Sequence, residues 1–233
     1  MGELAVATVA LDFGGTLATP GPSPRGPDVV AALELRLGWP TPTGLEAAVE
    51  EARAEAKAAY RQGAQTPWES ILADAWRRVG AEVPDLATVV DAVWQTVPDA
   101  VVDPRAVEVV RTLRRTRRAL VLACNTQRPI AHRRRTLAAT GLAACFDALV
   151  LSSDIGVAKP DSRFYAAVAD AAGVAPEAVL FVGDTLDKDV IGPRAFGMRA
   201  VLVCAGSPPP GLPEGVPVIA HVAELPDLLE QWP

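Results

Sequence analysis

Short apolar runs alternate with amphipathic stretches along most of this chain. The runs are rich in β-branched residues, which is typical of buried strands in a parallel sheet. They lie at residues 4–11, 119–124, 148–151, 179–182 and 200–204. The alternation predicts an α/β protein with a Rossmann-like, three-layer core, in which helices cover both faces of a parallel sheet.

Two of the helical stretches carry recognisable start and stop residues. Asp103 followed by Pro104 is typical of an N-cap with proline at the first helical position. Asp161 opens a second predicted helix, and Gly173 ends it. Both stretches have apolar residues at three- and four-residue spacing, so each helix is expected to cover one face of the sheet.

The interval from about residue 20 to residue 98 differs, because it contains no convincing strand. Patterns typical of capping boxes begin at Thr43 and Thr66, and each predicts the start of a helix. Further helices are expected at residues 28–37 and 85–94. The interval is therefore predicted to be all helical.

Proline-rich stretches at residues 19–27 and 98–104 flank this interval. Proline interrupts helices and restricts the backbone, so such stretches are typical of linkers. The sequence therefore predicts two units. Residues 1–18 and 100–233 form the sheet core, and residues 19–99 form an inserted helical unit.

Composition and charge exclude several classes of protein. Half of the 233 residues are hydrophobic, which is enough for a sizeable core, yet no apolar run approaches the ~20 residues of a membrane span. The net charge of −6 argues against binding to nucleic acid or to an anionic membrane. The arginine-rich segment 111–135 is interpreted as solvated helix faces. No secretory signal is expected from the first residues.

The cysteines and histidines also limit the chemistry. Cys124, Cys145 and Cys204 have no metal-ligand spacing and form no even disulfide set, so a reducing cytoplasm is expected. His132 and His221 are the only histidines and are far apart, which argues against a histidine-rich metal site. The abundance of Ala, Arg and Pro is typical of a bacterial genome of high GC content.

Asp12 directly follows the first apolar run and precedes a glycine turn formed by Gly14 and Gly15. A carboxylate in this place lies at the C-terminal end of a strand, where open α/β sheets bind ligands. An aspartate that ends a strand also caps turns, so further residues are needed to indicate chemistry.

Three later segments supply such residues. Cys124 and Asn125 end the second apolar run. Lys159 stands just before a proline that opens a helix. Asp184 and Asp189 follow the fourth run, in a Gly-Asp pattern with a second aspartate five positions later. Carboxylate oxygens at strand ends suit Mg²⁺, which prefers octahedral oxygen ligands.

In this order, the segments resemble the four signatures of the haloacid dehalogenase superfamily, whose hydrolases use an aspartate nucleophile. The first signature is usually written Asp-x-Asp-Gly-Thr-Leu, and this chain has Asp12-Phe13-Gly14-Gly15-Thr16-Leu17. The resemblance covers the whole chain. It implies that residues 19–99 are a helical cap that closes over the active site. It also implies a phosphatase-type hydrolase that uses Mg²⁺ and acts on a small phosphorylated metabolite.

The resemblance also implies a role for each matching residue. The expected nucleophile is Asp12, and Lys159 balances its charge and that of the phosphoryl group. The implied metal ligands are Asp12, the backbone carbonyl of Gly14, Asp184 and Asp189, the last as a ligand or an outer partner. The implied orienting and phosphate-binding residues are Thr16, Gly15, Cys124 and Asn125.

Two of these positions depart from the family pattern. Cys124 stands where the family has Ser or Thr, and a thiol is a weaker hydrogen-bond donor than a hydroxyl. The alternative to a phosphate-binding role is a small buried cysteine that packs as an apolar residue. Gly14 stands where the family has the aspartate that transfers protons. That transfer contributes ~10²–10⁴-fold to rate, so hydrolysis of simple monoesters is expected to be slow.

Several alternatives stay open. The chain is also compatible with a weak or inactive relative that binds a phosphorylated ligand or a protein partner. Dehalogenase chemistry does not need the missing acid, but its fourth signature differs from the Gly-Asp pattern kept in this chain. A phosphonatase would need a lysine in the cap, and Lys57 is expected on a solvated helix face. Arg61 and Trp68 are further candidates to contact a substrate.

Overall fold

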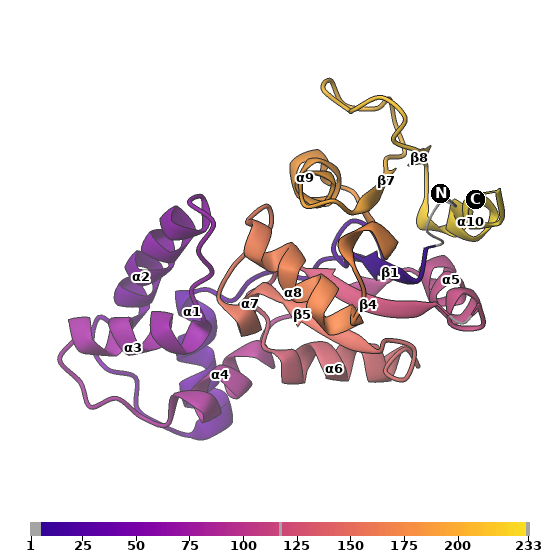
Figure 1. Ribbon diagram of the computed structural model, residues 1–233. Coiled ribbons are helices and arrows are strands. Elements are labelled where there is room, and N and C mark those ends of the chain that lie inside the picture. Colours follow the sequence, from indigo (N-terminus) through magenta and orange to yellow (C-terminus); the bar gives the residue numbers. More distant parts are fainter. Residues whose placement is uncertain (1–5, 117, 232–233) are drawn as a thin grey trace.

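A parallel six-stranded sheet lies at the centre of the computed structural model, which describes residues 6–116 and 118–231 (Figure 1). Its strands are β1 (Thr8–Leu11), β4 (Ala119–Cys124), β5 (Ala148–Leu151), β6 (Val179–Gly183), β7 (Arg199–Val203) and β8 (Val218–Ile219). Their spatial order is β5-β4-β1-β6-β7-β8. The predicted fold class is confirmed, although β8 was not predicted, and residues 4 and 5 of the first predicted strand lie outside the described residues.

β1 lies between β4 and β6 and is parallel to both. The strands that follow β1 are added first on the side of β4 and later on the side of β6, so the strand order reverses direction at β1. In open α/β sheets the connections after neighbouring strands leave toward opposite faces of the sheet at such a point. A crevice therefore forms outside the C-terminal ends of these strands. The residues that follow β1 therefore lie where this fold binds ligands.

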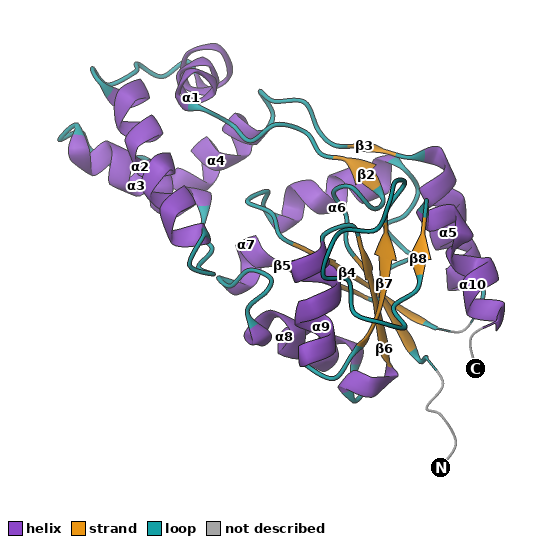
Figure 2. Ribbon diagram, turned by 90° about the horizontal axis from the view of Figure 1, so that it is seen from above, coloured by secondary structure: helices purple, strands orange, loops and turns teal. Residues whose placement is uncertain are grey.

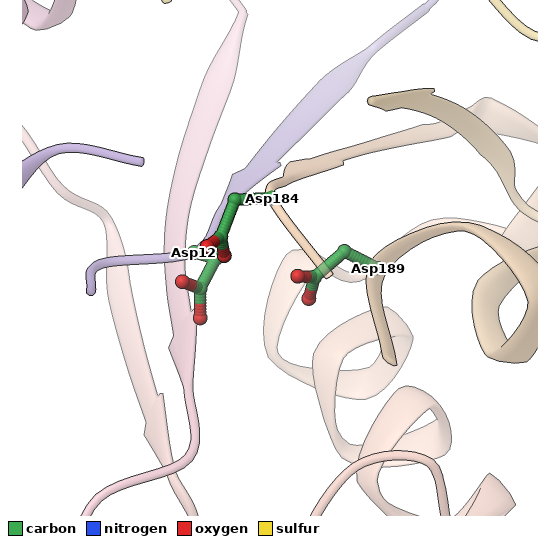
Figure 3. Close-up of side chains that lie close together, drawn as sticks. All are labelled: Asp12, Asp184 and Asp189. Atoms are coloured by element: carbon green, nitrogen blue, oxygen red, sulfur yellow. The ribbon is translucent and has the colours of Figure 1, made fainter. Parts of the chain in front are cut away.

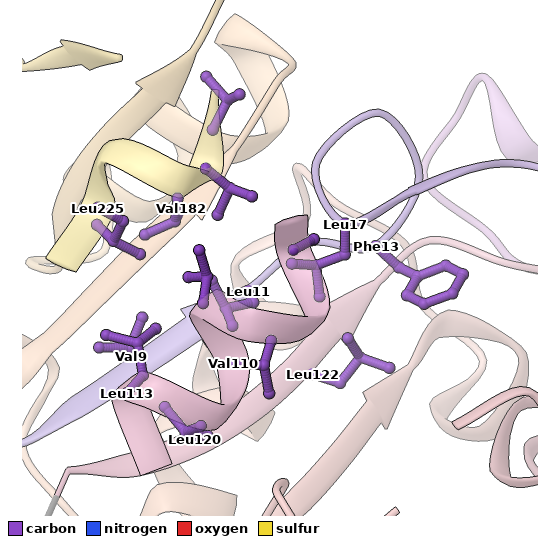
Figure 4. Close-up of a cluster of buried hydrophobic side chains, with 14 of the residues drawn as sticks. Val9, Leu11, Phe13, Leu17, Val110, Leu113, Leu120, Leu122, Val182 and Leu225 are labelled. Carbon is purple, nitrogen blue, oxygen red and sulfur yellow. The ribbon is translucent and has the colours of Figure 1, made fainter. Parts of the chain in front are cut away.

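Side chains of the central strands alternate between the two faces of the sheet, as the pleat requires. Leu11 and Leu122 belong to one buried cluster, drawn in part in Figure 4, whereas Ala10 and Val121 belong to another. The first face is covered by α5 (Pro104–Arg114), α6 (Ile130–Ala139) and α10 (Leu225–Gln231). The second is covered mainly by α8 (Ser162–Ala172), which contacts α9 (Gly192–Ala195). The result is a three-layer core (Figure 2).

Short helical segments complete the connections of this core. They are α7 (Ser152–Ile155), η2 (Pro176–Ala178), η3 (Leu186–Ile191) and η4 (Val222–Glu224). Of these, η3 directly follows the loop after β6, so it brings its own side chains to the C-terminal edge of the sheet.

The segment between β1 and α5 forms a separate helical layer to one side of the sheet (Figures 1 and 2). Its elements are α1 (Gly26–Ala31), η1 (Ala32–Leu37), α2 (Leu45–Tyr60), α3 (Trp68–Arg78) and α4 (Leu86–Trp94). These helices share a hydrophobic cluster of their own, from Val29 to Trp94. Two short antiparallel strands, β2 (Ala18–Thr19) and β3 (Val101–Val102), pair where the chain enters and leaves this layer.

The helix boundaries agree only in part with the sequence patterns. The Asp103 and Asp161 side chains accept hydrogen bonds from backbone amides two residues later, and Gly173 adopts a left-handed conformation, as predicted. The two capping boxes were wrong. Gly44 and Pro67 are the N-cap residues of α2 and α3, and neither helix has a side-chain cap. Each helix therefore begins two residues after the predicted threonine.

Candidate active site

The polar residues predicted at strand ends meet at the C-terminal edge of the sheet. Asp12 follows β1, Asp184 follows β6, and Asp189 lies in η3. Lys159 lies in the loop between α7 and α8. Asp12, Lys159 and Asp189 are buried, whereas Asp184 is exposed. Three loops and one short helix thus supply one cluster of charged side chains.

The Lys159 ammonium lies between two carboxylates. Its Nζ donates to Asp12 Oδ1 at 2.8 Å and to Asp189 Oδ1 at 2.7 Å. A third bond reaches the Ala123 carbonyl at 3.1 Å. All three donor hydrogens of the ammonium are therefore satisfied, and the lysine is held with only 3% of its surface exposed.

Burial and neighbouring charge set the protonation of this cluster. Burial alone would lower the pKa of Lys159, but the Asp12 and Asp189 carboxylates outweigh it and raise that pKa above its ordinary value. Burial, opposed by Lys159, raises the pKa of Asp12 to about 6. Burial and the nearby Asp189 charge also raise the pKa of Asp184. Negative charge is in excess over positive charge here, and a bound cation would relieve it.

Two glycines allow the carboxylates to approach the strand ends. Gly15 has a φ of +85°, and a Cβ there would overlap the Asp184 carboxylate. A Cβ at Gly183 would likewise overlap the Asp189 carboxylate. Asp189 is fixed further by its Oδ2, which accepts a hydrogen bond from the Thr185 backbone amide at 2.9 Å. Larger residues at these glycines would push the acidic groups apart.

The three carboxylates fit a metal ion of the Mg²⁺ type. Asp12, Asp184 and Asp189 each offer an oxygen, and these atoms all lie within 4.8 Å of one another (Figure 3). Hard carboxylate oxygens in a partly open site match the preference of Mg²⁺, which keeps several waters. Both Asp189 oxygens already accept hydrogen bonds, from Lys159 and from the Thr185 amide. Asp12 and Asp184 are therefore the more available ligands for a metal ion.

The remaining predicted residues surround Asp12. Thr16 Oγ1 is buried and has no hydrogen-bond partner among the described residues, as expected of a group that meets a ligand. The Asn125 side chain is engaged, because its Oδ1 accepts from the Lys159 backbone amide at 2.8 Å and its Nδ2 donates to the Lys159 carbonyl at 2.9 Å. It therefore holds the loop that carries Lys159.

Cys124 packs as an apolar residue and also borders a cavity. The side chain is buried in the apolar cluster of the first sheet face, yet it also lines a small cavity beside Gly14. Burial raises the pKa of its thiol to about 11, so the sulfur is protonated at neutral pH. The residue can offer a weak S–H donor but not a thiolate nucleophile.

A cavity of about 590 Å³ lies between helix α2 and the loop that follows β4. Its walls include Arg53, Lys57 and Tyr60 from α2, and Asn125 from the loop. The Asn125 Nδ2 donates to the Tyr60 hydroxyl at 2.9 Å, which links the two sides. Lys57 is exposed as predicted, but it faces this cavity.

Several residues of this region were missed or misread from the sequence. Trp68 is buried in the cluster of the helical layer, so it is a core residue of that layer and not a surface group. Arg128 and Arg133 are each 5% exposed, so the solvated interpretation of the arginine-rich segment was wrong for them. Arg117 of that segment lies outside the described residues. Gln65, which was not predicted, is buried and accepts a bond from Ser152. No local pattern distinguishes these side chains, because their burial depends on distant segments.

The fold is an open α/β sheet with an acidic cluster at its C-terminal edge, and residues 6–197 match the family described as haloacid dehalogenase-like hydrolase. The chain belongs to this family, and the resemblance noted in the sequence is confirmed. None of the helices in the described part of the chain is long and apolar enough to cross a membrane.

Curated relatives match shorter parts of the chain. Phosphoserine phosphatase of Thermus thermophilus is 42% identical over 93 residues, which are 40% of this chain and 37% of that protein. Glyceraldehyde 3-phosphate phosphatase of Methanopyrus kandleri is 39% identical over 66 residues, which are 28% of each chain. The matched region thus spans well under half the length of these relatives.

Solved structures with the same fold cover almost the whole chain. A 2-haloacid dehalogenase from Pseudomonas syringae pv. Tomato superposes with a TM-score of 0.67 at 21% identity, over 98% of this chain and all of that one. A haloacid dehalogenase-family phosphatase from Thermococcus onnurineus has a TM-score of 0.58 at 21% identity, over 95% and 97% of the two chains. At this identity the likeness shows the fold and not the reaction.

Proposed function

We propose that this chain is a Mg²⁺-dependent phosphohydrolase that acts on a small phosphorylated metabolite through an aspartyl phosphate. The observation that carries the proposal is the buried ion pair of Asp12 and Lys159 at the C-terminal edge of the sheet. A carboxylate held there by a lysine, beside a glycine turn, is placed to attack a bound phosphoryl group. The phosphatase names of two curated relatives support a phosphorylated substrate.

In the proposed reaction, a carboxylate oxygen of Asp12 attacks phosphorus in line. The bond between phosphorus and the ester oxygen breaks, and the electron pair leaves with that oxygen. Water then attacks the phosphorus of the aspartyl phosphate, which releases inorganic phosphate and restores the carboxylate. Lys159 balances negative charge in both steps, since its ammonium stays protonated between the two carboxylates.

The residues proposed to hold the metal are Asp12, Asp184 and the backbone carbonyl of Gly14. A Mg²⁺ ion bound there would neutralise charge on the phosphoryl oxygens. Asp189 is assigned a positioning role, because its two oxygens bind Lys159 and the Thr185 amide. The Thr16 hydroxyl and the amides of the Gly15 turn are proposed to orient the phosphoryl group, together with the Cys124 thiol and the Asn125 amide.

Gly14 limits the substrates that this site can turn over. The leaving oxygen receives no proton from residue 14, so it departs as an anion that solvent protonates later. Substrates with acidic leaving groups are therefore favoured over simple alkyl phosphates. Residues 19–99 are proposed to act as the cap, and the cavity of about 590 Å³ beneath α2 is proposed to hold the organic part of the substrate.

The test is hydrolysis of p-nitrophenyl phosphate, whose leaving group needs little protonation, with and without Mg²⁺. Wild type and Asp12→Asn are compared, and Asp187→Asn is the matched control because Asp187 is exposed and outside the acidic cluster. Metal-dependent turnover is expected in wild type and Asp187→Asn and not in Asp12→Asn. If wild type hydrolyses the ester no faster than Asp12→Asn, the proposal is overturned. That result would favour a relative that binds a phosphorylated ligand without hydrolysing it, which the absence of an acid at Gly14 also fits.

A further inference from the structure

A second, smaller cavity of about 170 Å³ opens beside Gly14, where the proposed reaction lacks its acid. The linker at residues 20–23 forms one wall, and the start of the loop after β4 forms another. Arg128 and Arg133 also line it. This cavity therefore joins the nucleophile turn to two buried arginines, a combination that the proposed reaction does not use.

Arg133 is the unusual member of this group. It lies on α6 and is 5% exposed, and its Nε and Nη1 are buried without a hydrogen-bond partner among the described residues. Its guanidinium packs 3.7 Å above the centre of the Phe13 ring, which fixes the plane of the fork without using its N–H groups. Buried donors on a charged group are costly when unpaired, so this arginine is placed to receive an anion.

The neighbouring arginine does not have this freedom. Arg128 stacks on Trp94 at 4.5 Å, its Nη1 lies 3.3 Å from Asp99 Oδ1, and its Nη2 donates to the Pro98 carbonyl. Its charge is therefore partly balanced by protein groups. Arg128 adds positive potential to the cavity, whereas Arg133 offers the vacant donors.

Among the described residues, the large cavity contains no equivalent group. Arg53 in that cavity already pairs with Glu50 at 2.6 Å, and Arg25 and Lys57 are exposed to water. A desolvated arginine with vacant donors binds an anion more strongly than a neutralised or hydrated one. The small cavity is thus the better place for a second negative charge.

The size and chemistry of the small cavity indicate which anion fits. A guanidinium fork binds a planar carboxylate through two parallel hydrogen bonds. A volume of about 170 Å³ admits a carboxylate with the few atoms that carry it, but is too small for a whole nucleotide. Gly14 leaves this space open on the side of the nucleophile, since it lines the cavity without a side chain.

We propose that Arg133 binds a carboxylate of the substrate, so that the substrates of this site are phosphate esters that carry a second, carboxylate anion. This inference rests on the proposed function. It assigns specificity to a residue of the sheet core rather than to the helical layer.

The kinetic test compares O-phosphoserine with O-phosphoethanolamine, two alkyl esters that differ by one carboxylate. Both are assayed at high enzyme concentration, because Gly14 makes the hydrolysis of alkyl esters slow. Arg133→Gln removes the charge and keeps a polar side chain, and Arg134→Gln is the matched control because Arg134 is the next, exposed residue of α6. Arg133→Gln is expected to raise the KM for O-phosphoserine by about 10- to 100-fold, as loss of a charged hydrogen bond predicts, and to change that for O-phosphoethanolamine by less than about twofold. An equal effect on both esters would overturn the inference.

A binding test separates this inference from the proposed function. Malonate carries carboxylates and no phosphoryl group, so calorimetry reports its binding without turnover. Wild type and Arg134→Gln are expected to bind malonate, and Arg133→Gln is expected to lose this binding while its circular dichroism melting curve stays cooperative. Arg133→Lys keeps the charge and is expected to bind with intermediate affinity. If wild type does not bind malonate, or if wild type and Arg133→Gln bind it equally, the proposed carboxylate site is overturned. This holds even if p-nitrophenyl phosphate is hydrolysed, so the two proposals fail separately.

Discussion

The Nζ of Lys159 lies 2.8 Å from Oδ1 of Asp12, although the two residues are 147 positions apart in the chain. The pair is almost completely buried, and the same ammonium also holds Asp189. A single cation therefore fixes Asp12, the proposed nucleophile, and the carboxylate of η3 in one arrangement.

Removal of this cation is expected to destabilise the fold as well as abolish activity. Lys159→Met leaves two buried carboxylates without a counter-charge, which typically costs about 3–5 kcal/mol in the free energy of unfolding. Urea denaturation at pH 7 measures the loss. Lys57→Met, at an exposed residue of α2, is the control and is expected to change stability by less than about 0.5 kcal/mol. Equal losses in the two variants would contradict the structural role of the pair.

Mg²⁺ is expected to raise the melting temperature of the protein. Asp12 and Asp184 repel each other in the absence of a cation, and a ligand that binds only the folded state stabilises it by about 2.7 kcal/mol at 100 times its Kd. Differential scanning calorimetry measures the shift. Asp184→Asn is expected to lose most of it, whereas Asp187→Asn keeps it. A shift of the same size in Asp184→Asn would place the ion elsewhere.

Gly14→Asp is expected to restore the missing acid. A Cβ at this position meets only Pro20, at 3.7 Å, which is an ordinary contact, so the side chain can be accommodated. Hydrolysis of alkyl phosphates is expected to rise by up to ~10²–10⁴-fold, and that of aryl phosphates much less, because only the former need protonation. Steady-state rates on both classes measure this difference.

Gly15→Ala is the contrasting variant. The backbone φ of +85° and the overlap of a new Cβ with Asp184 predict loss of metal binding and of activity. If Gly15→Ala were as active as wild type, the close approach of Asp184 to this turn would not be required.

Cys124 is expected to resist alkylation. Burial raises the pKa of its thiol to about 11, so roughly one molecule in 10³ carries the reactive thiolate at pH 8. Cys145 and Cys204 are more exposed and are expected to react first with iodoacetamide. Mass spectrometry of digested samples over time gives the order. Early labelling of Cys124 would show that the end of β4 is more open than the structure indicates.

His132 is expected to make the fold less stable in acid. Burial and the nearby Arg135 and Arg128 lower the pKa of His132 below its ordinary value near 6.5, although Asp91 and Asp99 oppose them. The unfolded chain then binds a proton that the folded chain does not. The free energy of unfolding therefore falls as pH drops below about 6.5, by up to about 1.4 kcal/mol per pH unit.

The comparison of wild type with His132→Gln isolates this effect from the other titrating groups. Urea denaturation between pH 7 and pH 5 is expected to give a shallower fall in the variant. The ring lies 3.1 Å from Asp91 of α4, so the same measurement tests a contact between the core and the helical layer. Parallel curves for the two proteins would contradict the lowered pKa.

Local patterns were sufficient for the elements that depend on neighbouring residues. The apolar runs predicted five of the six strands of the sheet. Asp103 and Asp161 marked helix starts, because a cap bonds amides two residues away. The capping box at Thr43 failed because the chain turns into α2 at Gly44, whose φ of 80° favours glycine. The one at Thr66 failed because Pro67 is the N-cap residue of α3. A motif of four residues does not contain that information.

The sequence by itself determined the sheet core, the family and the group of Asp12, Lys159, Asp184 and Asp189, because C-terminal ends of parallel strands meet at one edge. Only the tertiary structure decided that Lys159 joins Asp12 to Asp189, and that Asn125 holds the lysine loop. It also buried Arg133 against Phe13, beside the space left at Gly14. Such contacts join segments far apart in the chain, and burial and charge pairing arise only when those segments pack together.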